Sequence, residues 1–425
     1  MKNIFGKGDI YLKESFPLGS NNNGLLDKVC AMFFALTPIV QHYYGLYENA
    51  GFTLYLLILP FMIMKLIKAK YLISKSLVKP VIPLLLFEVY CLIIRVTSIG
   101  RILYSAFFFL FLILLFSGYI NVRLVVKYAA WIGIVATGFI VIQYGFYYVL
   151  HHPINFEPYR LLLPANSRWI VTIKYGRKLY RPSGFFLEPS HIFLYTFPII
   201  TFLLLSPNLN IWKKRVAIIL SIGVVLSTSG MGIFAVVGIW ALYLLTNGNV
   251  NLNAKQLTKK IFSVRTFIMF ILIIVIVIIA FTEVPFFRSA VLRIFAPGDG
   301  ENVSAIAGRT RRASNYVQNI EGFSSILFGT AGVNNDLDFS TSGFFATYIR
   351  WGIIGLVLSY AFYIEGVIKL KGPYYWFSIL VLILSFFTAH THGTFYMMYF
   401  AAYLANGYYI NTVNKKVLME NKLSV

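Results

Sequence analysis

Residues 126–150 read VKYAAWIGIVATGFIVIQYGFYYVL, and Lys127 is the one charged residue in this run. A helix needs about 20 predominantly apolar residues to cross the hydrocarbon core of a bilayer, so this run is long enough. Comparable runs recur along the 425-residue chain, which is 58% hydrophobic and only 12% charged. An average soluble domain carries about 25% charged residues. The sequence therefore predicts an all-α polytopic membrane protein.

We expect about twelve transmembrane helices. Their predicted ranges are 27–46, 50–67, 80–97, 101–120, 126–150, 190–206, 215–228, 230–246, 265–283, 342–366, 373–389 and 393–411. The spans divide the chain into a cytoplasmic segment, helices one to five, a long loop, helices six to nine, a second long loop, the last three helices and a cytoplasmic tail. These parts are residues 1–26, 27–150, 151–189, 190–283, 284–341, 342–411 and 412–425.

The basic residues assign the two sides of the membrane. The net charge of +22 would suggest nucleic acid in a soluble protein, but here it follows the positive-inside rule. With both termini cytoplasmic, 23 of the 37 basic residues fall inside, 20 of them Lys. Of the 14 that fall outside, 12 are Arg. Topology requires positive charge without distinguishing Arg from Lys, so this bias needs another cause.

Arginine has a planar fork that binds phosphate or carboxylate through two hydrogen bonds. The outer bias therefore indicates an anionic ligand at the extracytoplasmic face, with no nucleic acid. The alternative is that these arginines pair with outer carboxylates or with lipid headgroups. No cofactor motif and no metal-binding motif is present, so we expect neither a cofactor nor a metal.

The end of the first long loop, RPSGFFLEPSH at 181–191, combines charge with a rigid backbone. Its glycine and first proline predict a turn, and Pro189 suits the start of a helix. Glu188 would then lie at a helix N-terminus, where the dipole favours the carboxylate. Glu188 is either a general base or the partner of Arg181 in a salt bridge.

The second long loop carries more candidates. A predicted helix at 303–321 would place Arg309, Arg312 and Tyr316 on one face. A glycine turn, FGTAG at 328–332, precedes the predicted span that begins SGFFATYIRWGIIGL. Charged residues inside spans are functional candidates by default. Arg350 is either such a residue or one that snorkels to the surface, and Glu88 is either a proton relay or a neutral hydrogen-bonding group.

These motifs occur in a recognisable order. RPSGFFLEPSH, LSTSGMGIFAVVGIW at 226–240, an Arg-rich loop, FGTAG and SGFFATYIRWGIIGL together resemble the O-antigen polymerase (Wzy-type) and O-antigen ligase superfamily. The resemblance covers roughly 160–360. It implies a GT-C-like bacterial glycosyltransferase at the outer face of the cytoplasmic (inner) membrane, with two large extracytoplasmic loops.

The resemblance also implies a substrate and a site. The substrate would be an oligosaccharide on undecaprenyl pyrophosphate, and no cofactor or obligatory metal would be needed. Membrane lipids, a chain-length regulator and a flippase would be further partners. Carried onto this chain, the functional arginines that the resemblance implies would be Arg181, Arg288, Arg309 and Arg312. From the residues themselves we add Arg177, Arg350, Tyr316, Asp336 and Asp338 as substrate-binding candidates. We expect Glu188, or else His191, to take the proton from the acceptor hydroxyl, with Asp336 and Asp338 as further candidates.

Ligases of this superfamily usually carry a histidine just before the span that begins SGFFATYIRWGIIGL. This chain has Asp338, Ser340 and Thr341 there, which favours an O-antigen or capsule polymerase over a ligase. A lipid-linked oligosaccharide flippase or other transporter is the alternative from another class. A flippase needs charges along a path through the midplane, whereas the spans here carry few charges and the polar residues gather in two large outer loops.

Overall fold

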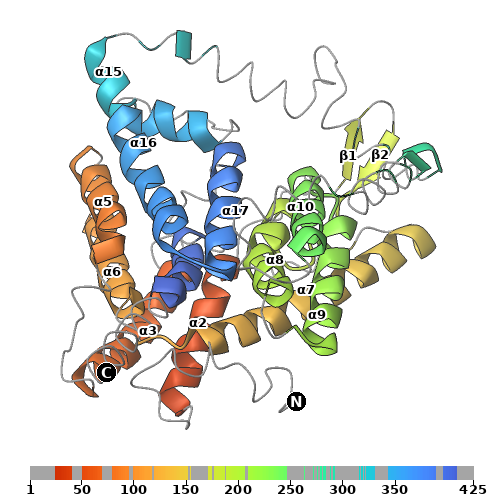
Figure 1. Ribbon diagram of the computed structural model, residues 1–425, viewed down its shortest axis with the longest axis horizontal. Coiled ribbons are helices and arrows are strands. Elements are labelled where there is room, and N and C mark those ends of the chain that lie inside the picture. Colours follow the sequence, from red (N-terminus) through yellow and green to blue (C-terminus); the bar gives the residue numbers. More distant parts are fainter. Residues whose placement is uncertain are drawn as a thin grey trace. The chain divides into compact units, whose positions relative to one another are not determined.

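The computed structural model describes part of the chain. The described residues are 24–40, 50–68, 79–94, 99–116, 119–151, 154, 171–174, 177–186, 188–205, 209–246, 263, 271, 275, 278–279, 281–283, 288, 291, 315, 317–318, 320, 322–330, 343–388 and 396–408. Helix dominates them, as the sequence predicts (Figure 1). The chain divides into two compact units, residues 1–129 with 309–425 (unit 1) and residues 130–308 (unit 2).

Unit 1 is a set of apolar helices. They are α2 (Leu25–Val40), α3 (Ala50–Lys68), the short 3-10 helix η2 (Lys79–Val81), α5 (Ile82–Ile94), α6 (Ile99–Phe116), α15 (Phe323–Phe328), α16 (Gly343–Lys369), α17 (Pro373–Phe387) and an unlabelled helix at 396–408. α16 packs against both α5 and α17. Stacked rings fill the interior, among them Phe34 on Phe111 with centroids 4.8 Å apart. Large apolar side chains thus provide the core of this unit.

Helix α16 is broken at Gly352, where φ is 64° and ψ is −166°. The short helix α15 ends against this break, and its last residue contacts the backbone there. A Cβ on Gly352 would collide with the Leu327 carbonyl oxygen, and one on Gly329 with that of Arg350. Only residues without a side chain allow the two backbones to approach this closely. The FGTAG segment therefore begins at a docking point between α15 and α16.

Hydrogen bonds satisfy the carbonyl groups beside this break. The Thr330 backbone N–H and hydroxyl both donate to the Ile349 carbonyl, at 2.8 and 3.0 Å. The Tyr90 hydroxyl donates to the Trp351 carbonyl at 2.7 Å. A break inside a helix exposes carbonyls that need such partners. The predicted span from 342 to 366 is consequently two helical segments joined at a fixed bend, which Figure 1 shows.

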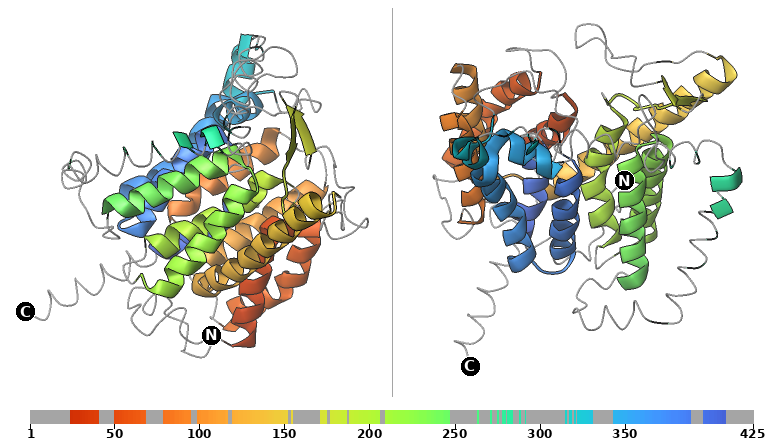
Figure 2. Two further views of the ribbon diagram at one scale, coloured as in Figure 1. Left: turned by 90° about the vertical axis from the view of Figure 1, so that its right-hand side faces the viewer. Right: turned by 90° about the horizontal axis from the view of Figure 1, so that it is seen from above.

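Unit 2 is built around α8 (Pro189–Leu204). Its other helices are α7 (Val122–Val149, which begins in unit 1), α9 (Ile211–Leu226) and α10 (Gly230–Thr246). Nearly every residue of α8 is buried, as expected for a helix that is apolar on all sides. α8 packs against both α9 and α10, and the views in Figure 2 show the three side by side. Among the described helices of unit 2, α8 is the most buried, so the segment that leads into its N-terminus is anchored in the core of the unit.

A hairpin precedes α8. Strands β1 (Val171–Lys174) and β2 (Arg177–Tyr180) pair antiparallel, with Val171 opposite Tyr180 and Lys174 opposite Arg177. The sequence pattern predicts only loop over 151–189, so these strands are a correction. Strand β2 ends at the residue directly before Arg181, so the hairpin leads into the predicted site.

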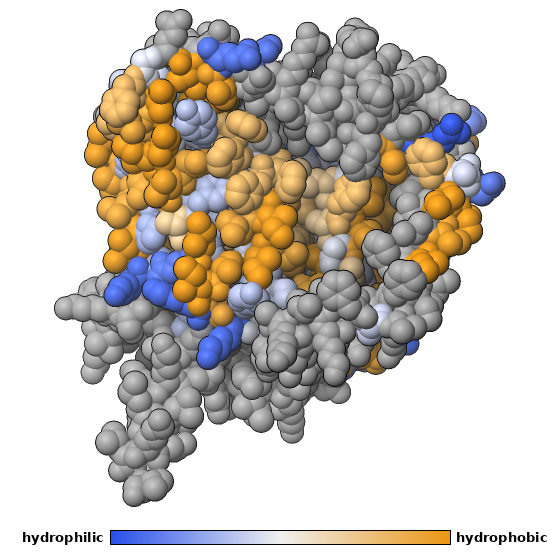
Figure 3. Space-filling view, turned by 45° about the horizontal axis from the view of Figure 1, so that its top comes forward, coloured by the Kyte–Doolittle hydropathy of each residue, from blue (hydrophilic) through white to orange (hydrophobic). Residues whose placement is uncertain are grey.

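Length and composition allow two described helices, Val122–Val149 and Gly343–Lys369, to cross a membrane. The bend at Gly352 leaves residues 353–369 as the longer straight part of the second, about 25 Å at 1.5 Å per residue. Several shorter apolar helices occur as well. Large apolar side chains such as Ile93 and Ile368 are more than 70% exposed, and Figure 3 shows broad apolar areas on one face.

Candidate functional site

The start of α8 carries Glu188 in the position that the sequence predicts. Glu188 is the N-cap residue with extended backbone angles, and Pro189 occupies the first turn. The Glu188 side chain caps no backbone N–H of the helix, but its carboxylate accepts a hydrogen bond of 3.0 Å from the Ser190 hydroxyl. The side chain is partly exposed. The carboxylate is thus held by Ser190 at the start of α8 and remains accessible from solvent.

His191, the other candidate base, lies on the third residue of α8. Its side chain is 1% exposed. The backbone N–H of His191 donates to the Glu188 carbonyl at 2.9 Å, which closes the first turn. A base must come within hydrogen-bond reach of the proton that it removes. Burial of the ring therefore favours Glu188 over His191 for this role.

Arg181 lies at the other end of the same segment and is 7% exposed. A guanidinium remains charged when buried, so Arg181 contributes a permanent positive charge to this part of unit 2. The turn that follows is tight: the Phe186 N–H donates to the Ser183 carbonyl at 3.0 Å, and Gly184 has φ of 63°. The turn predicted from RPSGFF is thus present between the arginine and the carboxylate.

Gln143 on α7 holds this turn in place, and it is not among the residues predicted for the site. Its side-chain carbonyl accepts from the Gly184 N–H at 2.9 Å, and its amide donates to the Ile154 carbonyl at 3.0 Å and to the Gly184 carbonyl at 3.5 Å. The side chain is 1% exposed. A buried amide that both donates and accepts fixes the backbone of the turn against the helix. A polar glutamine inside an apolar run was the signal available in the sequence.

The turn between α9 and α10 lies against the start of α8. The Ser227 hydroxyl is 3.3 Å from the Pro189 carbonyl and 2.8 Å from that of Val224, and it donates to both. Thr228 is buried and has φ of 60°, which is rare for a residue branched at Cβ. Two motifs from the ordered set, RPSGFFLEPSH and LSTSG, thus come together in unit 2.

Four tyrosines lie at the C-terminal end of α7 and the end of β2. Tyr147 stacks on Tyr180 with centroids 4.2 Å apart, and Tyr144 stacks with Tyr148 at 5.8 Å. Tyr180 also meets the edge of Tyr144 at 5.6 Å. Burial, together with the neighbouring Tyr147, raises the pKa of Tyr180 to about 12. The Tyr180 hydroxyl is therefore neutral at physiological pH.

The other predicted residues have varied positions. Arg177 is the first residue of β2. Arg288 is exposed, with its guanidinium 5.7 Å from the centroid of the Phe281 ring. Both belong to unit 2, as do Arg181 and Glu188. The predicted residues outside the described part of the chain are Arg309, Arg312, Tyr316, Asp336 and Asp338.

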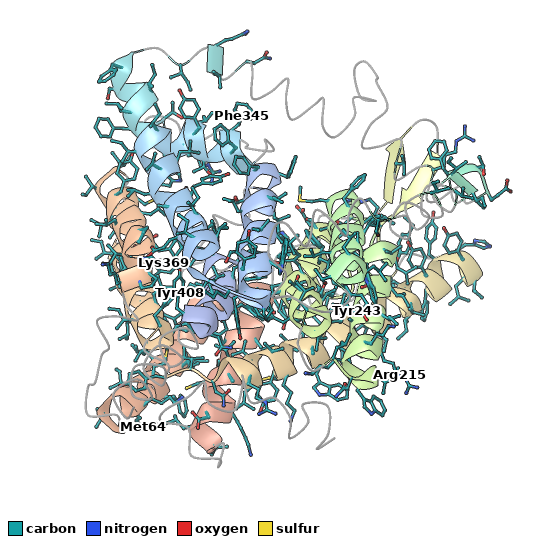
Figure 4. The ribbon with its side chains drawn as sticks, viewed as in Figure 1. Met64, Arg215, Tyr243, Phe345, Lys369 and Tyr408 are labelled. Atoms are coloured by element: carbon teal, nitrogen blue, oxygen red, sulfur yellow. The ribbon has the colours of Figure 1, made fainter. Side chains whose placement is uncertain are left out.

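In unit 1, Arg350 is exposed and lies two residues before the break in α16. It therefore belongs to the short segment, with Phe345, and not to the long one that ends at Lys369 (Figure 4). Arg350 lies two turns into α16, as the sequence predicts, but the helix is broken two residues later. Glu88 is buried and accepts a 2.6 Å hydrogen bond from the Ser105 hydroxyl, which agrees with the hydrogen-bonding interpretation.

Among the described residues, no group of three His, Cys, Asp or Glu side chains could hold a metal ion. The segment from Arg181 to Glu188 in unit 2 places a buried guanidinium and a partly exposed carboxylate on either side of one turn. Compared with known protein families, curated proteins and solved structures, the chain matches none.

Proposed function

We propose that this chain is a bacterial membrane glycosyltransferase, a polymerase of O-antigen or capsule repeat units. It transfers a glycan from undecaprenyl pyrophosphate to the next lipid-linked repeat unit at the outer face of the inner membrane. The observation that carries the proposal is the segment from Arg181 to Glu188, which combines a buried positive charge with a partly exposed carboxylate. The order of motifs and the outer arginine bias support it as well.

In the proposed reaction, the acceptor hydroxyl oxygen attacks the anomeric carbon of the donor glycan. The bond from that carbon to the pyrophosphate oxygen breaks, and the electron pair leaves with the pyrophosphate. Arg181, with the other outer-loop arginines, neutralises the charge that develops on the leaving group. Glu188 accepts the proton from the attacking hydroxyl. Arginine is suited to this role because its fork binds a phosphate through two hydrogen bonds.

The membrane setting belongs to the same proposal. About twelve spans, two large outer loops and two cytoplasmic termini would place unit 2's site at the outer surface. Apolar helices with exposed apolar faces support this setting. The basic cluster at the start of α9, where Arg215 lies 5.3 Å from the Trp212 ring, would face the cytoplasm.

The test is glycan analysis in cells. A deletion strain should accumulate a single capped repeat unit, facing outward, in place of a polymer ladder. The Arg181→Lys variant keeps the charge but loses the fork, so it should lose most of the ladder. The matched control is Arg215→Lys, which changes an exposed arginine of unit 2 and should leave the ladder intact.

Three outcomes would contradict the proposal. A full ladder from the Arg181→Lys variant would exclude the arginine fork from the reaction. Inward-facing repeat units in the deletion strain would indicate a flippase. A normal ladder that fails to reach its final acceptor would indicate a ligase.

A further inference from the structure

The four tyrosines form one packed cluster, and its most exposed ring belongs to Tyr148. Tyr148 is 59% exposed, whereas Tyr180 is 2% exposed. Tyr144 packs nearly parallel to the Tyr148 ring, with centroids 5.8 Å apart and an interplanar angle of 4°, and Tyr147 meets it at 82°. Two neighbouring rings therefore support the Tyr148 ring, and much of its surface remains accessible.

The cluster is fixed to the elements that carry the proposed catalytic residues. The Tyr144 hydroxyl donates to the Leu226 carbonyl at 2.6 Å, in the turn that contacts Pro189 through Ser227. Tyr147 stacks on Tyr180, whose next residue along the chain is Arg181. An aromatic ring held in this way loses little conformational entropy when a ligand stacks on it.

We propose that the exposed face of Tyr148 is a carbohydrate-binding subsite, on which a sugar ring of the glycan stacks. Sugar rings present flat faces of C–H groups, whose partial positive charge suits the negative face of an aromatic ring. The Tyr148 hydroxyl lies at the ring edge, beside the polar rim of such a sugar. The inference rests on the proposed function for the identity of the glycan.

An aromatic belt at the membrane surface is the other explanation for tyrosines at a helix end. A belt residue needs only to place its ring at the headgroup level, and contact with another ring is not required. Here each of the four rings contacts two of the others, Tyr144 donates to a carbonyl at the end of α9, and Tyr180 directly precedes Arg181. This arrangement favours a ligand shared with the catalytic residues.

The experiment measures binding of a lipid-free probe to the purified full-length chain in detergent. The probe is an oligosaccharide released by mild acid from the surface polymer of the same strain. Saturation-transfer NMR should show contact with the sugar C–H protons. The Tyr148→Leu variant should bind about 3- to 10-fold more weakly, while Tyr148→Phe, which keeps the ring, should bind like the wild type.

Trp131 provides the control, because it is another exposed aromatic residue of α7, with 37% of its surface exposed. It lies about 25 Å along the helix from Tyr148. The Trp131→Leu variant should bind the oligosaccharide like the wild type. The proposal is overturned if the wild type does not bind the probe, if Tyr148→Leu binds normally, or if Tyr148→Phe loses as much affinity as Tyr148→Leu.

A belt residue would give a different result. Tyr148→Leu would then reduce reconstitution into vesicles of phosphatidylethanolamine and phosphatidylglycerol, and oligosaccharide binding would be unchanged, which overturns the proposal. The ladder assay tests the proposed function separately from this subsite. A deletion strain that keeps its ladder would refute the polymerase function, whereas Tyr148-dependent oligosaccharide binding would still demonstrate the sugar subsite.

Discussion

Replacing Gln143 by leucine removes the contact that holds the turn before α8 against α7. The variant leaves the Gly184 N–H and the Ile154 carbonyl without the partners at 2.9 and 3.0 Å that Gln143 provides. A buried polar group without a partner costs about 1–3 kcal/mol. Burial of the apolar leucine side chain offsets part of this cost. We therefore expect Gln143→Leu to lower the free energy of unfolding by about 2–4 kcal/mol.

The assay is thermal unfolding of the purified chain in detergent, followed by tryptophan fluorescence. At about 2–4 °C per kcal/mol, the midpoint should fall by about 4–16 °C. Ile142→Ala is the control, because Ile142 is the preceding residue of the same helix and is 46% exposed. Equal midpoints for the two variants would refute the inferred role of Gln143. The ladder should also shorten in Gln143→Leu cells, since the turn positions Glu188.

Two glycine substitutions test the backbone at the turn and at the bend. Gly184→Ala places a side chain at φ of 63° and a Cβ 3.0 Å from the Ala136 carbonyl oxygen, so we expect a loss of about 1–3 kcal/mol, measured as a lower unfolding midpoint. Gly352→Ala places a side chain at φ of 64°, where its Cβ overlaps the Leu327 carbonyl. It should lower the free energy of unfolding by at least about 2 kcal/mol and increase proteolysis. Gly145→Ala is the shared control, because a Cβ there meets nothing within 4 Å and should stabilise by about 0.5–1 kcal/mol. A Gly184 or Gly352 variant as stable as this control would contradict the reasoning.

The position of Glu188 illustrates what local sequence can predict. A proline favours the first turn of a helix because its missing N–H is not needed there. An apolar run after Pro189 then requires a buried helix, and the charge before it remains at the end of that helix. The turn at Gly184 follows in the same way, since glycine adopts positive φ without strain. These features depend on residues within a few positions of one another.

The bend in α16 illustrates what local sequence does not contain. SGFFATYIRWGIIGL is apolar enough for one continuous helix, and glycine inside an apolar helix is common in membranes. The break follows from the docking of α15, with Tyr90 and Thr330 satisfying the freed carbonyls. Tyr90 and Trp351 are 261 residues apart along the chain. No periodic pattern encodes such a pair.

The sequence by itself determined that the described chain is largely helical, because apolar runs of this length have few other ways to satisfy their backbone in an apolar setting. It also placed an arginine and a glutamate on one rigid segment. Only the tertiary structure decided what braces that segment: Gln143 from α7, Ser227 from the α9–α10 turn and the tyrosine cluster. Hydrogen bonds and ring contacts between distant residues depend on three-dimensional packing, and they leave no signature in composition or spacing.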